Sequence, residues 1–575
     1  MQKAKLKYLI KCFLKKHHIA ENRYKFKNKE FYLYEKINEQ CIILEGLGKR
    51  PKGNMLYIAK ELSKKKYKNF KVYFSVTQEN FNQSKAILRQ YGLTKVIPVI
   101  AGSFEYKRVM FSAKYLFNEV DFPNWWIKKP GQIYCNIWHG TPLKRLGKAR
   151  YSMDIHLNAN EQRNFTMPDY LLFPNEYTRK RILEDCGIKA VTNAKAIMLG
   201  YPRTAGLYNE KAEKQIRDHY RIGRKQLITW MPTWRQEFSK ERAVQFLDAM
   251  DAALSENQIL YVNLHHKIDT AIDYRAYKRV KRFPDEIDIY EFLCAADVLI
   301  TDYSSVFFDF AVRRKKIILY CEDLKEYVRD RGLYLDIDSL PFPVTKTVEE
   351  LLRELQDGIQ YDDSQFLNTY NNYDSEKNAE LLCEVVVKGN ESIVKCDKIN
   401  TKMEPITVLF TEGFENNLET EYLYDIYNAK LLSDQVYLSY HEKTASENLD
   451  NLYPIVKEHN TIAIKGKPFF NIVEHDRIYS TLPIKKVILY DTDVFYRINT
   501  FALFQEPVYL FISNKLAKKI AENDKRIIEA ITLFIKNGNR ILSIHKDCLD
   551  LLKKRFGINA QYIENTRQLR EFINE

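Results

Sequence analysis

The sequence predicts an α/β protein whose sheets are parallel and covered by helices. Three observations lead to this class. Short apolar runs alternate with helical patterns from about residue 41 onward, the runs stop at small or polar residues, and the series divides into two halves of comparable length followed by a third. Strands that alternate with helices are typical of βαβ units, whose strands pair in parallel.

The expected elements follow one another at short intervals. Strands of the first half are expected at Cys41–Leu44, Phe70–Ser75, Val96–Ile100, Gln132–Trp138, Tyr170–Phe173 and Ala196–Leu199, and those of the second at Leu227–Met231, Leu260–Leu264, Asp297–Thr301 and Lys316–Tyr320. A third series comprises Ile406–Phe410, Val436–Ser439, Lys486–Tyr490, Val508–Ile512 and Arg540–Ile544. Helices are expected at Gly53–Lys65, Glu176–Cys186, Ala243–Ser255 and Ser305–Arg313.

These series divide the chain into four parts. Residues 1–40 form a basic N-terminal segment, 41–200 a first α/β half, 201–395 a second half, and 396–575 an additional α/β domain. The break between the halves falls at Gly200-Tyr201-Pro202, so a crevice is expected between them. With 575 residues and 45% hydrophobic content, the chain can fill several cores.

Composition narrows the cellular setting. No apolar stretch approaches the roughly 20 residues of a membrane span, and the start lacks the pattern of a signal peptide. The nine cysteines occur without a C-x-x-C pair, which favours reduced thiols over a disulfide framework or a zinc site. We therefore expect the protein in the cytoplasm.

The net charge of +15 indicates an anionic partner, which is nucleic acid, acidic lipid headgroups or a phosphate-bearing substrate. Part of this charge lies at the N-terminus, where lysines surround an apolar stripe at helical spacing. The lysines are Lys3, Lys5, Lys7, Lys11, Lys15 and Lys16, and the stripe is Leu6, Leu9, Ile10, Phe13 and Leu14. Such a helix either lies in an anionic membrane interface or packs on the protein's own core, and charge alone does not separate the two.

One segment leaves a histidine at the end of a strand. It reads Trp138-His139-Gly140-Thr141-Pro142-Leu143-Lys144. An imidazole at this place could take a proton from an attacking hydroxyl, because its pKa lies near neutral pH. Gly140 permits a tight turn or the close approach of a ligand. Lys144 and Arg145 either supply positive charge to the site or are solvated helix residues.

A second segment, residues 296–310, leaves Ser304 and Ser305 at the start of a helix. The N–H groups exposed there favour phosphate, although the serines could equally cap the helix and do nothing more. Asp309, one turn later, could accept hydrogen bonds from sugar or glycerol hydroxyls. Because open α/β sheets bind ligands at the carboxyl ends of their strands, a base beside a phosphate cradle predicts a phosphoryl-transfer site.

Three further clusters lie at expected loop tips. Gly200-Tyr201-Pro202-Arg203 offers an arginine that could bind phosphate with two hydrogen bonds. Met231-Pro232-Thr233-Trp234-Arg235 offers Thr233 and Arg235 as donors and Trp234 as a stacking surface. Asn263-Leu264-His265-His266-Lys267 offers two histidines, which we interpret as donors to phosphate because no carboxylate or cysteine lies at metal-ligand spacing.

Several nucleotide-binding classes are excluded. The chain lacks a Walker-type phosphate loop, a G-x-G-x-x-G dinucleotide fingerprint and the protein kinase signatures. Asp491-Thr492-Asp493 matches the metal-binding Asp-x-Asp of some sugar transferases, but so short a pattern occurs often by chance. We assign no metal.

In their order along the chain, these motifs resemble those of the CDP-glycerol glycerophosphotransferases, the teichoic-acid primases and polymerases of Gram-positive cell envelopes, with relatives that make capsular polymers. The resemblance covers roughly residues 41 to 390 and extends to Asp323-Leu324, Tyr327 and Asp330-Arg331-Gly332-Leu333-Tyr334. It implies a GT-B-like fold of two Rossmann-type domains that face each other across a cleft. Residues 41–200 would then lie on the acceptor side and residues 201–395 would bind the donor, while residues 396–575 are not explained by the resemblance.

The same resemblance implies the reaction. Glycerol phosphate or ribitol phosphate would pass from a CDP-activated donor to a lipid-linked polymer acceptor, and CMP would be released. No cofactor or metal would be required. The protein would lie peripherally on the cytoplasmic face of the cell membrane, with the anionic membrane surface as a partner and no nucleic acid.

By motif, His139 and His265 are the catalytic candidates. His139 would activate the acceptor hydroxyl, and His265 would hold the pyrophosphate together with Arg203, Ser304 and Ser305. Asp309 would bind the polyol hydroxyls, and Thr233 with its neighbours would line the nucleotide side. The substrate-binding candidates are Trp138, Gly140, Thr141, Pro142, Arg203, Pro232, Thr233, Arg235, Asn263, Leu264, His266, Ser304, Ser305 and Asp309. Asn263 and His266 depart from the family pattern, so His266 could take the place of His265.

Two other functions are weighed against this one. A nucleotide-sugar glycosyltransferase of the same architecture, acting in cell-surface polysaccharide synthesis, would move a sugar and release a nucleoside diphosphate. The second of these functions is that of a non-enzymatic protein that binds membrane or nucleic acid, although the sequence contains no nucleic-acid module of recognised type. The sequence leaves open glycerol or ribitol, primase or polymerase, wall polymer or capsule, the role of residues 396–575 and the oligomeric state.

Overall fold

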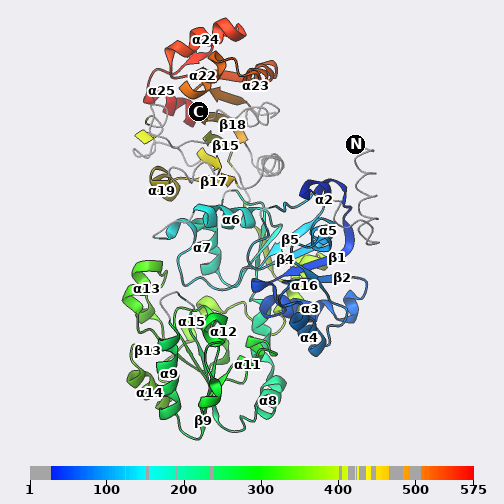
Figure 1. Cartoon of the computed structure of the whole chain (residues 1–575), viewed down its shortest axis with the longest axis vertical. Coiled ribbons are helices and arrows are strands. Elements are labelled where there is room, and N and C mark those ends of the chain that lie inside the picture. Colours follow the sequence, from blue (N-terminus) through cyan, green and yellow to red (C-terminus); the bar gives the residue numbers. More distant parts are fainter. Residues whose placement is uncertain are drawn as a thin grey trace.

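The computed structural model describes residues 27–123, 125–150, 155–189, 191–233, 235, 239–400, 404–411, 421, 424–425, 436–441, 449–464, 484–491 and 507–575. The expected N-terminal helix, Trp234 and residues 492–493 of the Asp-x-Asp pattern lie outside these ranges, as does the side chain of His266. The described residues form three sheets of mostly parallel strands covered by helices (Figure 1), so the predicted α/β class is confirmed.

The first sheet has the strand order β14-β7-β6-β5-β4-β1-β2-β3. Its strands are β1 (Asn38–Glu45), β2 (Lys71–Val76), β3 (Ile97–Ile100), β4 (Ala113–Asn118), β5 (Ile133–Asn136), β6 (Tyr170–Phe173), β7 (Lys195–Met198) and β14 (Lys395–Lys398). Its helices are α2 (Asn28–Tyr34), α3 (Gly53–Leu62), α4 (Phe81–Gln90), α5 (Phe104–Ser112), α6 (Ile155–Thr166) and α7 (Glu176–Asp185). Only β14 runs antiparallel to its neighbour, β7.

The second sheet has the order β10-β9-β8-β11-β12-β13, and all its strand pairs are parallel. Its strands are β8 (Gln226–Met231), β9 (Gln258–Val262), β10 (Val280–Arg282), β11 (Val298–Thr301), β12 (Lys316–Tyr320) and β13 (Val344–Thr345). Its helices are α8 (Glu210–His219), α9 (Lys240–Ala253), α10 (His266–Asp269), α11 (Ile289–Leu293), α12 (Val306–Phe310), α13 (Leu324–Arg331), α14 (Val348–Gln356) and α15 (Ser364–Tyr370). The inner strands are apolar because helices bury both faces of the sheet.

The third sheet has the order β17-β16-β15-β18-β19-β20-β21 and is also parallel among its described strands. Its strands are β15 (Ile406–Thr411), β16 (Val436–His441), β17 (Thr461–Ile464), β18 (Ile484–Asp491), β19 (Val508–Phe511), β20 (Arg540–Ser543) and β21 (Gln561–Tyr562). The described helices are α19 (Leu449–Glu458), α22 (Asn514–Ala521), α23 (Lys525–Lys536), α24 (Lys546–Phe556) and α25 (Thr566–Asn574).

All three sheets share one topology. In each, the chain starts at a central strand, adds strands toward one edge and then crosses back to build the other side. The crossing places a switch point between β1 and β4, between β8 and β11, and between β15 and β18. Ligands of open α/β sheets bind at the carboxyl ends of the strands at such points. The first two switch points supply the residues of the candidate site.

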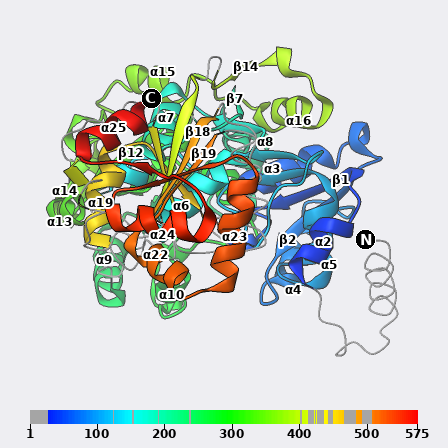
Figure 2. The same ribbon diagram turned by 90° about the horizontal axis from the view of Figure 1, so that it is seen from above.

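The chain returns to the first sheet after completing the second. Helix α16 (Asn378–Lys388) packs against α3, and β14 pairs with β7. Two segments connect the first sheet and the second, one leaving β7 and one returning to α16. They lie side by side, as the hydrogen bond from the N–H of Gly200 to the carbonyl of Tyr373 over 3.0 Å shows. Part of the range 201–395 therefore covers the first sheet, as Figures 1 and 2 show for α16. Local periodicity does not reveal such a return, because it depends on contacts between distant segments.

The third sheet lies against the first part of the chain, at the top of Figure 1. Strand β17 lies beside α6, and the side-chain amide of Gln162 donates to the carbonyl of Thr461 over 2.7 Å. A shared hydrophobic cluster contains Phe165 and Met198 together with Ile462. Among the described helices, none combines the length and the apolar character needed to cross a bilayer.

Candidate active site between the first two sheets

His139 lies in the loop that follows β5, beside the switch point of the first sheet. The N–H of Ile137 still pairs with the carbonyl of Asn118, and the Asn136 side chain accepts the N–H of Trp138 over 2.9 Å. This contact accompanies a left-handed backbone at Trp138, with φ at +55°. Few non-glycine residues adopt that conformation, and those that do cluster at functional sites.

The imidazole of His139 is oriented by a backbone carbonyl. Its Nδ1 lies 3.0 Å from the carbonyl oxygen of Glu119, the residue that follows β4. Because a carbonyl accepts only, Nδ1 carries the proton and Nε2 keeps the lone pair. The ring also lies against Trp138, with ring centroids 4.0 Å apart. The geometry therefore presents Nε2 as a proton acceptor.

The pKa of His139 is lowered to about 4, chiefly by burial, with smaller contributions from the positive charges of Arg203 and Lys144 and an opposing one from the hydrogen bond to Glu119. The imidazole is consequently neutral at physiological pH, which is the form that a general base requires.

Gly140 brings the histidine loop into direct contact with the second sheet. A Cβ atom at this position would lie 2.5 Å from the Oγ of Ser305 and 3.4 Å from a guanidinium nitrogen of Arg203. Only a glycine permits this approach. His139 and Ser305 line one cavity of about 150 Å³, so the base and one of the two expected phosphate-binding serines are brought together.

Replacing Gly140 by alanine is expected to lower kcat at least tenfold, because the new methyl group must displace Ser305 or the histidine loop and overpacking of this kind costs about 1–3 kcal/mol. Steady-state kinetics on purified protein checks this result. Gly358→Ala is the matched control, since a Cβ there meets nothing within 4 Å. Unchanged kcat in Gly140→Ala would contradict the close packing described here.

Ser305 precedes α12 but its side chain makes no capping hydrogen bond. Its Oγ is thus not used by the helix, and the interpretation of this serine as a mere cap is not supported. Ser304 is half-buried beside it and does not line the cavity.

Arg203 and Asp309 form a buried ion pair that holds the histidine loop. The Nε and Nη2 of Arg203 donate to one Asp309 oxygen over 3.1 and 2.7 Å, and the Tyr290 hydroxyl donates to the same oxygen over 2.8 Å. The Nη1 of Arg203 donates to the carbonyl of His139 over 2.8 Å. We expected these two residues to contact phosphate and polyol directly. In the structure they pair with each other, and both side chains are nearly excluded from water.

A short β-bridge joins the histidine loop to the segment that follows α13. Lys144 bridges Leu333, the N–H of Arg145 donates to the carbonyl of Gly332, and the N–H of Tyr334 donates to the carbonyl of Leu143 over 2.8 Å. The hydroxyl of Tyr334 also accepts the N–H of Leu146 over 2.9 Å. The segment 330–334 therefore pairs with the His139 loop and holds it against the second sheet.

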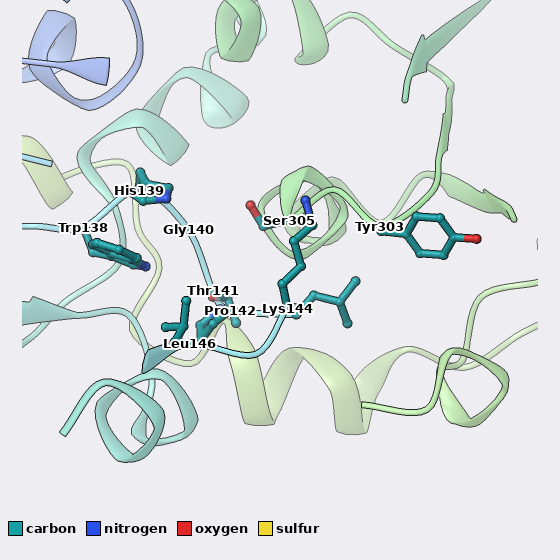
Figure 3. Close-up of a pocket in the computed structure, with 10 residues that line it drawn as sticks. Trp138, His139, Gly140, Thr141, Pro142, Lys144, Leu146, Tyr303 and Ser305 are labelled. Atoms are coloured by element: carbon teal, nitrogen blue, oxygen red, sulfur yellow. The ribbon is translucent and has the colours of Figure 1, made fainter. Parts of the chain in front are cut away.

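Lys144 directs its ammonium group into the cavity toward Ser305, with His139 across from it (Figure 3). Among the described residues no carboxylate forms an ion pair with this lysine. Burial lowers its pKa, and the charge of Asp302 partly offsets this effect. A half-buried cation that the described residues leave without a counterion indicates a site for an anion.

Arg235 is enclosed by two aspartates at the ends of neighbouring strands. It donates to Asp302 over 2.8 Å and to Asp323 over 2.7 and 2.9 Å, and its Nη1 also reaches the carbonyl of Thr233. The N–H of Thr233 donates to Asp302 over 2.7 Å. Arg235 thus fixes the loop after β8 and Tyr303, over whose ring it lies. We expected it to donate to the substrate; the observed contacts are with the protein.

The segment 263–267, which follows β9, lies one strand further from the switch point between β8 and β11 than the loop after β8 does. His265 precedes α10 and, like Asn263, is half-buried outside the lining of the His139 cavity. Leu264 is 8% exposed and packs in the core beneath α9, so its side chain does not face that cavity. His139 and Ser305 thus line one cavity, and His265 is not part of that lining. Pro232 is half-buried in the loop after β8.

The cavity lining is Trp138, His139, Gly140, Thr141, Pro142, Leu143, Lys144, Leu146, Tyr303 and Ser305. Six of these are site residues predicted from the sequence, and for Lys144 the sequence left a site role and a solvated position open. Tyr303, Leu143 and Leu146 were not predicted, nor was Glu119, whose backbone orients the imidazole. Tyr303 lies in the segment 296–310 next to Ser304, and this proximity was the available signal. No local pattern distinguishes Glu119. In the described part of the chain, no group of three His, Cys, Asp or Glu residues is arranged to hold a metal ion.

Comparison with known proteins identifies the family. The sequence profile of the CDP-Glycerol:Poly(glycerophosphate) glycerophosphotransferases matches residues 28–388. A teichoic acid poly(glycerol phosphate) polymerase from Bacillus spizizenii is 30% identical over 359 residues, which are 58% of this chain and 87% of that protein. A teichoic acid glycerol-phosphate primase from Bacillus subtilis is 28% identical over 326 residues, which are 54% of this chain and 82% of that protein.

The fold is shared with a solved structure as well. The wall teichoic acid polymerase TagF superposes with a TM-score of 0.55 and 22% identity, over 68% of this chain and 98% of that one. The predicted GT-B-like arrangement of α/β units is supported at this level. Because the family profile covers more than half of the sequence, the chain belongs to the CDP-glycerol:poly(glycerophosphate) glycerophosphotransferase family and is a transferase.

Proposed function

We propose that this protein transfers glycerol phosphate or ribitol phosphate from a CDP-activated donor to a hydroxyl of a lipid-linked polymer acceptor, in teichoic-acid or capsular polymer synthesis. One observation carries the proposal. A neutral imidazole with its Nε2 lone pair available shares a cavity with a serine hydroxyl and with an ammonium group that has no carboxylate partner among the described residues. A base opposite phosphate-binding donors is the arrangement that phosphoryl transfer requires.

In the proposed reaction, Nε2 of His139 accepts the proton of the acceptor hydroxyl as its oxygen attacks the polyol-bearing phosphorus. A new P–O bond forms to the acceptor, and the P–O bond to CMP breaks, so that CMP leaves with the electron pair. Such a displacement depends on positioning and on neutralising charge rather than on a covalent enzyme intermediate. We assign no metal or cofactor to the reaction.

Lys144 and Ser305 supply the charge and hydrogen bonds on the phosphate side. The ammonium group has no carboxylate partner among the described residues, so the anionic donor would be its counterion. The Arg203–Asp309 pair acts indirectly. Arg203 donates a hydrogen bond to the carbonyl of His139 and so helps to orient the imidazole. The loop after β8, fixed by Arg235, is the proposed nucleotide side.

Replacing Lys144 by glutamine is expected to lower kcat/KM for the CDP-polyol donor by about 10²-fold, since hydrogen bonds to charged groups contribute about 1.5–3 kcal/mol. Initial-rate kinetics with varied donor checks the loss. Lys148→Gln, in the 3₁₀ helix Gly147–Ala149 outside the cavity lining, is the matched control. Equal rates for both variants would exclude Lys144 from phosphate binding.

The pH dependence follows from the lowered pKa of His139. The unprotonated base predominates above its pKa of about 4, so the acidic limb of kcat/KM is expected near pH 4 instead of the ordinary histidine value of 6.5. A bound pyrophosphate would favour the imidazolium, so the limb in kcat should lie at higher pH than the limb in kcat/KM. Rates between pH 4 and 8, on protein shown to remain folded, test this. Coincident limbs near 6.5 would contradict the assignment.

The direct test supplies radiolabelled CDP-glycerol or CDP-ribitol with a lipid-linked acceptor and follows CMP and the size of the product. The proposal expects CMP release coupled to labelled acceptor with one of the two donors. Product length then separates a primase from a polymerase. Turnover of a nucleotide sugar with release of a nucleoside diphosphate, and none with either CDP-polyol, would overturn the proposal in favour of a glycosyltransferase.

We also propose the division of labour along the chain. Residues 41–200 would bind acceptor and residues 201–395 donor, as two Rossmann-type domains across a cleft, with residues 396–575 as an additional domain. The lipid-linked acceptor would place the enzyme peripherally on the cytoplasmic face of the membrane. The surplus of 90 Lys and Arg over 75 Asp and Glu supports contact with an anionic surface.

A further inference from the structure

A second hollow, of about 320 Å³, lies on the first sheet away from His139. It forms where α3 ends and where β2 and β3 begin. Its lining is Leu62, Ser63, Lys64, Lys65, Tyr67, Lys68, Phe70, Val72, Lys95 and Val96. His139 follows the carboxyl end of β5, whereas this hollow lies at the amino ends of β2 and β3. Because these strands are parallel members of one sheet, the two sites lie at opposite edges of it.

The floor of this hollow is apolar. Leu62, Tyr67, Val72 and Val96 are at most 5% exposed, and Phe70 packs edge-on against Tyr67 with ring centroids 6.2 Å apart. Phe70 is half-buried, so its ring is the part of the floor that still meets solvent. A ligand with an apolar part is favoured here, since covering this ring removes its surface from water.

The rim is basic and only partly neutralised. Lys64 pairs with Glu61 over 2.5 Å, and the neighbouring Lys66 pairs with Glu61 over 2.9 Å and with two further glutamates. Lys65, Lys68 and Lys95 are exposed, and no ion pair to them exists within the described ranges. The nearby carboxylates thus pair with Lys64 and Lys66. Around the opening, the ammonium groups of Lys65, Lys68 and Lys95 are left without an ion pair to a described residue.

A fourth cation lies close to the aromatic part of the floor. The Nζ of Lys388, at the end of α16, lies 5.3 Å from the ring centroids of both Tyr67 and Phe70. Like charges gathered in this way repel one another, so an anion bound among them gains from several attractions at once.

We propose that this pocket binds a phosphate-bearing amphiphile, namely the headgroup and first chain carbons of one anionic phospholipid. The phosphate would contact Lys65, Lys68 and Lys95, and the apolar part would cover the floor. A wholly polar phosphodiester chain would leave the Phe70 ring uncovered, and an uncharged lipid would leave the lysines without a counterion. The pocket is separate from the transfer site, so the proposal does not depend on the assignment of His139.

The test measures binding of short-chain ligands to the full chain by isothermal titration calorimetry. Dihexanoyl phosphatidylglycerol, below its micelle concentration, is compared with dihexanoyl phosphatidylcholine and with glycerol 3-phosphate. The anionic lipid is expected to bind at least about tenfold more tightly than either. The triple variant K65Q/K68Q/K95Q is expected to lose at least about tenfold in affinity, since each lysine near an anionic headgroup contributes about 1 kcal/mol and 1.4 kcal/mol is a factor of ten.

A matched control removes the same charge elsewhere. Lys211, Lys214 and Lys225 are exposed and unpaired within the described residues of the second half, so K211Q/K214Q/K225Q should bind the lipid like the unmodified protein. Equal affinity of both triple variants would overturn the proposal. Equal binding of glycerol 3-phosphate and the lipid would also overturn it, because the ligand would then be phosphate alone. Transfer to a water-soluble acceptor analogue should be unchanged in K65Q/K68Q/K95Q, which separates failure here from failure of the proposed reaction.

Discussion

Replacing His139 by alanine is expected to lower kcat for CDP-polyol transfer by about 10²–10⁴-fold, the range that general-base catalysis contributes. The imidazole has its Nδ1 hydrogen tied to the carbonyl of Glu119, so Nε2 is the atom that accepts the proton. Removing the ring leaves the phosphate-side donors Lys144 and Ser305 in place. The KM for the donor should therefore change much less than kcat, and single-turnover measurements at saturating donor would resolve the two effects.

The control for this experiment is the exposed His219 on α8, whose replacement by alanine should leave kcat unchanged. Circular dichroism and thermal unfolding of both variants establish that each is folded. A His139→Ala enzyme with undiminished kcat would remove the general base from the mechanism. The same loss in both variants would point to an effect on the fold instead of the chemistry.

Replacing Asp309 by alanine is expected to reduce the free energy of unfolding by about 3–5 kcal/mol, because Arg203 would remain buried with its charge uncompensated. The freed guanidinium would also no longer hold the carbonyl of His139 in its present direction. We therefore expect a lower kcat together with the lower stability. Urea unfolding followed by fluorescence measures the first effect, and steady-state kinetics the second.

The double replacement R203M/D309L separates the two roles of the pair. Apolar side chains of similar volume often restore the stability lost when one member of a buried ion pair is removed. Stability should recover in the double variant while kcat stays low, because no donor would remain for the carbonyl of His139. Recovery of both would show that the pair has no positioning role. Asp273→Ala, which breaks an exposed pair with Arg275, should change the free energy of unfolding far less than Asp309→Ala does and serves as the control.

Much of the fold could be predicted from the sequence, because strand and helix periodicity are local properties. The expected strand at Leu227–Met231 and the observed β8 differ by one residue, and the expected helix Ser305–Arg313 is divided into α12 and a 3₁₀ turn. Strand β4 was not predicted, although it forms half of the first switch point. It begins at Ala113, directly after the preceding helix, and Lys114 interrupts its short apolar run, so periodicity alone did not separate the strand from that helix.

The candidate site was predicted less completely than the fold. His139 and Ser305 were expected to meet, and they do, because both follow strands whose carboxyl ends open on the same cavity. Arg203 and Asp309 were each expected to reach the substrate, and that contact stays a prediction. The ion pair between them was not predicted, because it joins residues 106 positions apart.

The sequence by itself determined that this is an α/β protein with a histidine and two serines at strand ends, because the alternation of apolar runs and the residues that interrupt them are local. Only the tertiary structure decided which donors remain for a ligand. Arg203 and Arg235 are engaged by aspartates from distant segments, whereas Lys144 is left without a described carboxylate partner. The physical reason is that a charge withdrawn from water is stable only with a counterion from the protein or from a bound ligand, and the path of the chain determines which charges find one within the protein.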